Sequence, residues 1–169
     1  APETVRAKGG LRPGGAARCL PVGKCVSGEG AGVSGAAIVS SRAGMPDIVT
    51  FDVGGTSTDV SLVSGGQPRF TRSRDVAGHP VRLPMVDITV IGAGGGSIAH
   101  VDASGGLKVG PRSAGAVPGP AAYGKGGQNP TLTDANIVLN RLNPVSLLDG
   151  RLPVDRDAAC RTVERNVAD

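Results

Sequence analysis

The chain has 169 residues, of which 39% are hydrophobic and 19% are charged, so it can form one folded domain with a buried core. Its net charge of +4 comes from residues 1–25, which carry five basic side chains and one acidic one, whereas the rest of the chain is balanced. This balance, together with 2% aromatic residues, argues against a nucleic-acid-binding surface, and no apolar run is long enough to span a membrane. Three cysteines without a CxxC pair are expected to be free thiols, which fits a cytoplasmic protein.

The first part of the chain predicts a leader and a helix. Residues 1–25 show no helix or strand periodicity, so we expect a poorly ordered basic leader, or the edge of something larger, before a domain over 26–169. Within residues 26–44, a glycine-rich loop is expected to open a short helix. Four residues of this helix are expected to pack on a sheet: Ala36, Ala37, Ile38 and Val39.

The middle of the chain is typical of strands. Two apolar runs, over 47–53 and 59–63, and an alternating stretch over 68–76 predict three strands in an antiparallel meander. Residues 86–91 predict a further strand. Together with the flanking helices, these strands indicate an α/β fold with a mixed sheet.

The remaining residues predict a hairpin, a loop and two helices. Residues 97–110 alternate around a Gly-Gly turn and predict a hairpin, and the Pro/Gly-rich residues 111–130 predict an ordered loop or a lid. A helix is expected over 132–142, with Thr133 as its N-cap because a threonine hydroxyl can accept from the first-turn N–H groups. The last helix is expected over about 155–167.

The sequence "FDVGGTSTDV", residues 51–60, has the chemistry of a phosphate-binding turn. Glycines without a Cβ let a phosphate approach the backbone N–H groups, and the following hydroxyls add donors. The residues expected to contact phosphate are Gly54, Gly55, Thr56, Ser57 and Thr58. Asp52 is the candidate to hold Mg²⁺ through water, and Asp59 either supports that metal or caps the turn. An ordinary hairpin would use the same residue types, so the pattern alone leaves both interpretations open.

A second glycine cluster, "VIGAGGGSIA" at residues 90–99, follows a predicted strand. It departs from the dinucleotide-binding fingerprint, because Ser97 stands in place of the third glycine. Its small residues are candidates to approach a nucleotide or a substrate, with a tight turn as the alternative: Gly92, Gly94, Gly95, Gly96 and Ser97.

Metal and catalytic side chains are harder to assign. His79 is a candidate metal ligand with Asp87 as its companion, but a lone histidine without partners at metal spacing is more often structural. No Ser-His-acid set accompanies a nucleophile-elbow sequence, so we assign no catalytic residue.

Four segments occur in the order found in one enzyme family: "FDVGGTSTDVSLV", "DITVIGAGGGSIAHVD", "GGLKVGPRSAGAVPGPAAYGKGG" and "PTLTDANIVLNRLNP". "SGEGAGVSGA", residues 27–36, matches more loosely, because Glu29 stands where the family usually has proline. Residues 26–160 therefore resemble the hydantoinase A/5-oxoprolinase family, which includes a subunit of acetone carboxylase. The first segment also resembles the phosphate loop of actin-like ATPases.

The resemblance implies an actin-like, ribonuclease-H-related α/β domain that uses ATP and Mg²⁺. Family members hydrolyse cyclic amides such as hydantoins and 5-oxoproline, or carboxylate ketones, through phosphorylated intermediates. The motif "TDAN" implies that Asp134 and Asn136 line the cleft, with helix-end chemistry as the alternative for Asp134.

The resemblance also implies something about whether the domain is complete. The loop at 54–58 resembles the second of the family's two phosphate loops, which implies an incomplete domain. The implied partners are a missing N-terminal half and a hydantoinase B-type subunit or domain. Two alternatives stay open, a non-catalytic nucleotide-binding module and an inactive fragment.

Overall fold

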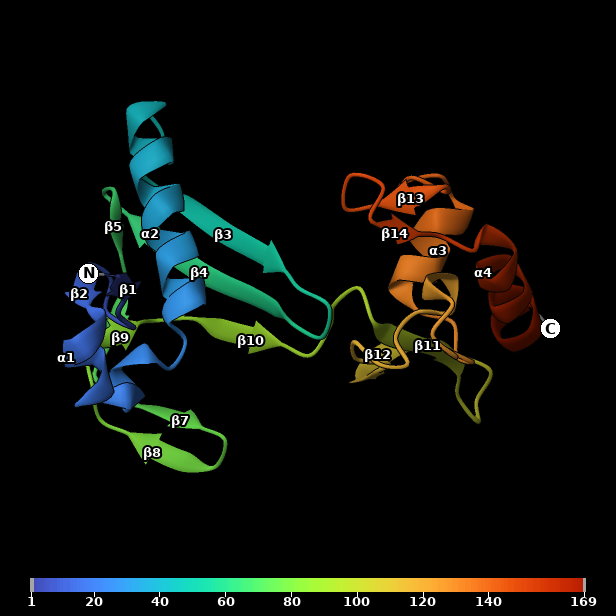
Figure 1. The fold of residues 1–169 in the computed structure, drawn as a ribbon, viewed down its shortest axis with the longest axis horizontal. Helices are drawn as coiled ribbons and strands as arrows, with labels where there is room; N and C mark the ends of the chain where they lie inside the picture. The colour runs from blue at the N-terminus through green and yellow to red at the C-terminus, as the bar shows by residue number, and fades with distance from the viewer. Residues whose placement is uncertain (1, 169) are drawn as a thin grey trace. The chain divides into compact units, whose positions relative to one another are not determined.

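The computed structural model describes residues 2–168, which form two compact units (Figure 1). Unit 1 contains the chain up to Asp52 together with Asp59–Val90, and unit 2 contains Val53–Thr58 and the chain from Ile91 onward. The sequence "FDVGGTSTDV" is therefore divided between the two units. Neither boundary falls at residue 25, where the sequence predicted the end of a leader.

The N-terminal residues of unit 1 are folded, which corrects the expectation of a poorly ordered leader. β1 (Glu3–Val5) and β2 (Leu11–Pro13) pair antiparallel, and α1 (Gly14–Arg18) and η1 (Pro21–Lys24) follow them. Ala7 ties this segment to the rest of unit 1, because its N–H donates to Gly23 at 2.9 Å and its carbonyl accepts from Val86 at 3.0 Å. Backbone hydrogen bonds of this kind leave no periodic pattern in the sequence.

α2 (Ser27–Arg42) includes the glycines that were predicted to form a loop, and Gly30 is the tightly packed one among them. A Cβ at Gly30 would lie 3.2 Å from the Ala7 carbonyl oxygen. The buried face of α2 has helical spacing and consists of Gly30, Val33, Ala37 and Ser40. Ala37 packs inward as predicted, but Ile38 and Val39 are 56% and 68% exposed, because the helix turns them to the opposite face.

The main sheet of unit 1 has the strand order β10-β4-β3. It contains β3 (Ile48–Val53), β4 (Thr58–Ser64) and β10 (Thr89–Ile91), and β5 (Gln67–Pro68) pairs antiparallel with β4. α2 lies along this sheet (Figure 1), and the buried cluster between them consists of Val33, Ala37, Val63, Val86 and Ile88, with Ile48 packed against it. The first two predicted strands are therefore neighbours.

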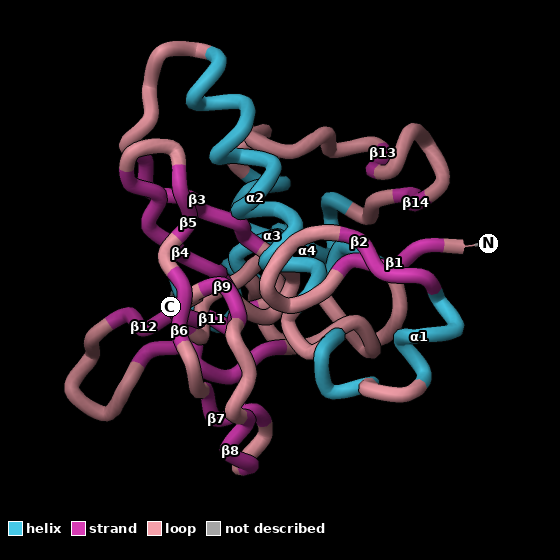
Figure 2. The backbone as a smooth tube through the Cα atoms, turned by 90° about the vertical axis from the view of Figure 1, so that its left-hand side faces the viewer, coloured by secondary structure: helices cyan, strands magenta, loops and turns pink. Residues whose placement is uncertain are grey.

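The predicted third strand over 68–76 is wrong. Its residues divide among β5, β6 (Phe70–Thr71), which pairs with β9 (Met85–Val86), and β7 (Arg74–Val76), which pairs with β8 (His79–Val81). The predicted strand over 86–91 likewise divides between β9 and β10. Figure 2 shows these strands as short segments separated by loops. Alternation alone could not reveal such pairings, because it does not show where one short strand ends and the next begins.

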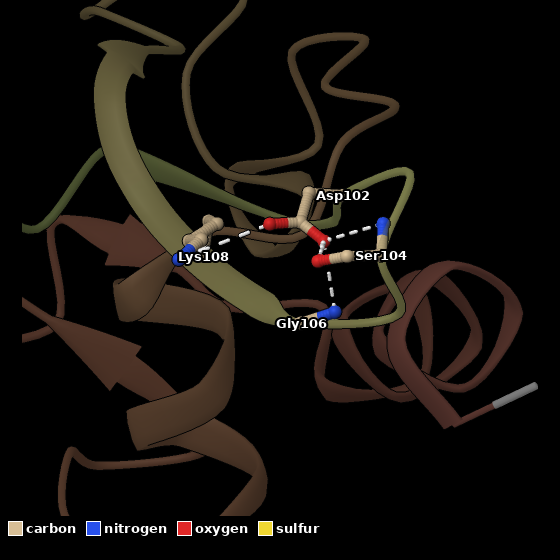
Figure 3. Close-up of polar contacts among 4 residues, drawn as sticks. All are labelled: Asp102, Ser104, Gly106 and Lys108. Carbon is tan, nitrogen blue, oxygen red and sulfur yellow. Dashed lines mark hydrogen bonds and ion pairs between the residues drawn. The ribbon is translucent and has the colours of Figure 1, made fainter.

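In unit 2, β11 (Ser97–Val101) and β12 (Leu107–Ser113) form the predicted hairpin. Asp102 organises its turn by accepting from the Ser104 hydroxyl at 2.6 Å and from the N–H groups of Ser104 and Gly106 at 2.9 Å (Figure 3). These hydrogen bonds, that of the Ser104 hydroxyl first, lower the pKa of the Asp102 carboxyl group. Lys108 adds an ion pair at 3.8 Å.

The core of unit 2 joins η2 (Ala121–Tyr123), α3 (Leu132–Val138) and α4 (Arg156–Val163). Ala122, Ile137 and Ala159 are its buried centre. α3 ends before the predicted residue 142, and its N-cap is Thr131 instead of Thr133. α4 continues into the π-helical turn η3 (Glu164–Ala168), close to the predicted helix, and β13 (Ser146–Leu147) pairs antiparallel with β14 (Leu152–Pro153).

Cys19, Cys25 and Cys160 are free thiols. Over residues 2–168, no helix combines the length and the apolar character needed to cross a membrane.

Candidate functional site

The predicted phosphate-binding residues form an exposed turn in unit 2. The Gly54 N–H donates to the Ser57 carbonyl at 2.8 Å and closes this turn. Among residues 2–168, no protein group accepts from the N–H groups of Gly55, Thr56 and Ser57, and the first two of these residues are exposed. Successive free N–H groups in a glycine turn form a concave site that binds anions such as phosphate.

The second glycine cluster supports this turn by donating hydrogen bonds to its carbonyl groups. The N–H groups of Gly95 and Gly96 donate to the carbonyls of Gly54 and Gly55 at 2.9 and 2.6 Å. The buried Thr58 hydroxyl donates to the Ala93 carbonyl, so this hydroxyl is used within the protein. The bracing occupies the acceptors of the turn and leaves its donors free.

Glycine is required in the bracing segment because the two backbones touch. A Cβ at Gly94 would lie 2.7 Å from the Gly54 carbonyl oxygen and 2.8 Å from the Ser57 nitrogen. A Cβ at Gly96 would lie 2.8 Å from the Gly55 carbonyl oxygen. In native structures Cβ atoms do not approach so closely, so these glycines serve the packing of the two loops.

The other predicted members of this cluster have different surroundings. A Cβ at Gly95 would lie 2.8 Å from the Thr133 hydroxyl, whereas one at Gly92 would meet its nearest atom, on Pro111, at 3.6 Å. Ser97 is fully buried, and its hydroxyl oxygen accepts from the Gly94 N–H at 2.8 Å. Contact of these residues with a nucleotide stays a prediction.

Asp134 is completely buried and is engaged by the protein. Its carboxylate accepts from the N–H groups of Ala121, Ala122 and Thr131 and from the Thr131 hydroxyl, at 2.7 to 3.2 Å. It therefore joins the start of α3 to η2, which is the helix-end role. Asn136 is half-buried, and its side chain has no hydrogen bond among the described residues, so it is the freer of the two predicted substrate contacts.

The predicted acidic residues, Asp52 and Asp59, lie in unit 1. With Glu29 they line a cavity of about 330 Å³. Burial raises the pKa of the Asp59 carboxyl group, the negative charges of Glu29 and Asp52 raise it further, and Arg74 opposes the shift. Glu29 is the acid that the sequence analysis did not assign, although its place in a motif that usually has proline was a signal.

These carboxylates suit a divalent cation by charge, since oxygen ligands with negative charge are those that Mg²⁺ prefers. Over the described part of the chain, no three acidic, histidine or cysteine side chains are close enough to ligate one ion. Mg²⁺ held by these residues through water stays a prediction. His79 is exposed on β8 and belongs to no such group among residues 2–168, and its role as a ligand with Asp87 stays a prediction.

The hydantoinase/oxoprolinase family model matches residues 3–169. The chain belongs to the hydantoinase/oxoprolinase family. The match includes almost all of residues 1–25, so the segment that resembled nothing in sequence is part of the family's domain.

Several enzymes of the hydantoinase/oxoprolinase family are similar to this chain. Caprolactamase subunit alpha of Pseudomonas jessenii is 42% identical over 164 residues, which cover 97% of this chain and 24% of that protein. Acetophenone carboxylase gamma subunit of Aromatoleum aromaticum is 43% identical, over 83% of this chain and 20% of that protein. 5-Oxoprolinase of Saccharomyces cerevisiae is 41% identical, over 84% of this chain and 11% of that protein. The chain spans a quarter or less of the length of these relatives.

Two solved structures share the fold. The nucleotide-free structure of acetone carboxylase, described in terms of ATP-dependent acetone carboxylation, has a TM-score of 0.78 and 29% identity, and covers 97% of this chain and 23% of that chain. The ATP-dependent caprolactamase from Pseudomonas jessenii has a TM-score of 0.66 and 45% identity, and covers 78% of this chain and 19% of that chain. The predicted α/β class is therefore confirmed.

Proposed function

We propose that this chain supplies a phosphate-binding loop to an ATP-dependent enzyme that hydrolyses cyclic amides. The exposed turn at residues 54–57 carries the proposal, because its N–H groups at positions 55–57 have no protein acceptor and its carbonyls are held by the second glycine cluster. The similarity to an ATP-dependent caprolactamase and to 5-oxoprolinase supports ATP and a cyclic amide as the ligands.

In the proposed reaction, the amide oxygen attacks the terminal phosphorus of ATP, and ADP leaves. Water then adds to the activated carbon and the ring C–N bond breaks, which frees the amine and leaves an acyl phosphate. A second water attacks the acyl carbon, and phosphate departs with the former amide oxygen. The free N–H groups of the turn, together with the hydroxyls of Thr56 and Ser57, would bind phosphate oxygens and stabilise their charge. The Thr58 hydroxyl is excluded from this role by its hydrogen bond to Ala93. We assign no proton-transfer residue.

Mg²⁺ fits the acidic cavity of unit 1, where Asp52 would hold it through water with Glu29 and Asp59 nearby. When bound, the ion would supply positive charge that screens phosphate oxygens. We also propose that a second phosphate loop comes from outside this sequence, which contains one Gly-Gly-Thr motif. The names of the relatives, which are alpha, beta and gamma subunits, support a multi-subunit enzyme, for which we propose a hydantoinase B-type partner in the cytoplasm.

Ketone carboxylation is the second candidate function. It is favoured by the acetone carboxylase structure, which matches 97% of this chain, against 78% for the caprolactamase structure. In that reaction a phosphorylated enolate would replace the phosphorylated amide. A nucleotide-binding module without catalysis is the remaining alternative.

The deciding experiment measures ADP formation by the complete gene product with its partner subunit. Caprolactam and 5-oxoproline are tested as amides, and acetone and acetophenone with bicarbonate are tested as ketones. Amide-dependent ADP formation supports the proposal, whereas ketone-dependent formation supports carboxylation. MgATP binding without ADP formation from any substrate supports the module.

Asp52→Asn tests the metal role in the same assay. We expect a loss of roughly 100-fold or more in substrate-dependent ADP formation, because a carboxylate that holds Mg²⁺ is worth several kcal/mol in phosphoryl transfer. Asp149→Asn is the matched control, since Asp149 is exposed and has a positive φ of 53° that asparagine tolerates. Equal activity of both variants would remove Asp52 from the mechanism.

A further inference from the structure

The folded N-terminal segment of unit 1 encloses a cavity of about 250 Å³ with an unusual charge. Three cations line it: Arg6, Lys8 and Arg12. The remaining lining residues are apolar or glycine, and they include Ala7, Leu20 and Leu83. No acidic side chain lines the cavity, so three positive charges share one small space.

The charges of this cavity are unpaired within the described structure. The one ion pair among residues 2–168 joins Lys108 to Asp102, in unit 2. The Arg6 Nε atom is buried and has no hydrogen-bond partner among the same residues. A buried guanidinium N–H without an acceptor costs free energy, which an anion that reached this atom would recover.

The arrangement follows from the register of the β1–β2 hairpin. Thr4 lies opposite Arg12, and strand alternation places their side chains on one side of the hairpin. Arg6 and Lys8 lie beyond the end of β1, in the connection to β2, and they line the same cavity as Arg12. Glu3 lies opposite Pro13 and points to the other side, which separates the only acid of the segment from the cations.

The walls of the cavity are held by backbone hydrogen bonds. The turn between β1 and β2 is closed by the Arg6 N–H, which donates to Gly10 at 3.1 Å, and by the Gly9 N–H, which donates to Arg6 at 2.9 Å. Ala7 is 3% exposed and bonds both to Gly23 and to Val86. The backbone that carries the cations is therefore fixed by hydrogen bonds in the absence of a ligand.

We propose that this cavity binds a small organic dianion, a phosphate monoester or a dicarboxylate with a short carbon chain. Two arginines and a lysine match a doubly charged head group, because guanidinium groups pair with phosphate and carboxylate oxygens in a bidentate manner. Leu20, Leu83 and Ala7 provide the surface for the carbon chain. The residues that line this cavity include none from the proposed phosphate turn, so this site does not duplicate that turn.

The test is calorimetric titration of the complete gene product with propyl phosphate, glutarate and inorganic phosphate. We expect saturable binding of propyl phosphate or glutarate, and weaker binding of inorganic phosphate, which has no carbon chain to bury. The two organic probes distinguish a phosphate ligand from a dicarboxylate. Absence of saturable binding of both organic probes up to about 10 mM would overturn the proposal.

The double variant Lys8→Gln/Arg12→Gln assigns the signal to the cavity. We expect its affinity for the organic dianion to fall roughly 10- to 100-fold, because charge-assisted hydrogen bonds are lost. Lys8 is exposed and Arg12 has no side-chain hydrogen bond among the described residues, so the fold should tolerate both changes. Phosphate binding at residues 54–57 would survive this variant, which keeps the proposal independent of the proposed function.

Arg18→Gln is the matched control, since Arg18 is exposed on α1 and does not line the cavity. We expect its affinity to stay within about twofold of the unmodified protein, as for other solvent-screened charges. An equal loss of affinity in the control and in the double variant would show that net charge alone attracts the anion, and would overturn the proposal.

Discussion

Replacing Gly94 by alanine should separate the turn at residues 54–57 from the second glycine cluster, which holds it. The new Cβ would lie 2.7 Å from the Gly54 carbonyl oxygen, and 2.8 Å from both the Ser57 nitrogen and the Thr56 carbonyl carbon. All three neighbours are backbone atoms, so no flexible side chain can move aside. The two loops must separate by roughly 0.5 Å or more to reach normal contact distances.

The cost of this separation can be approximated from the structure. Overpacking a tightly packed site costs about 1–3 kcal/mol. Separation also weakens the hydrogen bonds from Gly95 to Gly54 and from Gly96 to Gly55, at about 1 kcal/mol each. We therefore expect the local free energy of opening to fall by roughly 3 kcal/mol, which corresponds to about 100-fold faster amide exchange.

The assay is hydrogen exchange of the complete gene product, followed by mass spectrometry on peptides that contain residues 92–97. The control is Gly55→Ala, because a Cβ at Gly55 meets no atom within 4 Å and the residue has no positive φ. We expect unchanged exchange in this control. Its MgATP affinity should nevertheless fall roughly tenfold, since the methyl group would occupy the space that a phosphate approaches.

Two results would refute this reasoning. Unchanged exchange at residues 92–97 in Gly94→Ala would show that the glycine cluster does not brace the turn. Unchanged MgATP affinity in Gly55→Ala would show that no phosphate approaches this backbone. The two outcomes are independent, so structure and ligand binding are tested separately.

Three further predictions follow from individual side chains. Asp134→Asn should lower the free energy of unfolding by roughly 2–4 kcal/mol, because an amide N–H₂ would face N–H donors. Asn136→Ala should leave it nearly unchanged. Equal melting temperatures of the two variants would contradict the helix-end role of Asp134. The pKa of Asp59 is higher in the folded state than in the unfolded state, so at a pH between these two pKa values only the folded state keeps the proton. The free energy of unfolding of unit 1 should therefore fall as the pH rises through the folded-state pKa. Asp59→Asn should flatten this dependence in exchange measurements, and an unchanged profile would exclude Asp59 as its source. Phe51 is 67% exposed on the sheet face opposite α2, so Phe51→Ser should lower light scattering by the 169-residue chain, whereas Val117→Ser, in an exposed loop, should change it little; equal effects would argue against the sheet face as the cause of association.

Local patterns predicted much of the secondary structure. The hairpin β11–β12, the last helix and the strand β3 were evident because each is defined by the spacing of residues within one segment. The strand over 68–76 failed because its alternation was real but its pieces have three different partners. Thr133 failed as the N-cap because Thr131, two residues earlier, forms a reciprocal pair with Asp134 that sequence spacing does not single out.

Ordered motifs were enough to indicate the family, because they can be read directly from the sequence, and they also predicted a phosphate-binding turn at residues 54–58. Tertiary structure alone decided what those residues touch. Gly94 and Gly54 are forty positions apart, yet their backbones are in contact, and Glu29 joins Asp52 and Asp59 around one cavity. The same is true of the N-terminal hairpin, where Arg6, Lys8 and Arg12 line one cavity. Contacts between distant positions depend on the path of the backbone, and neither composition nor periodicity contains that path.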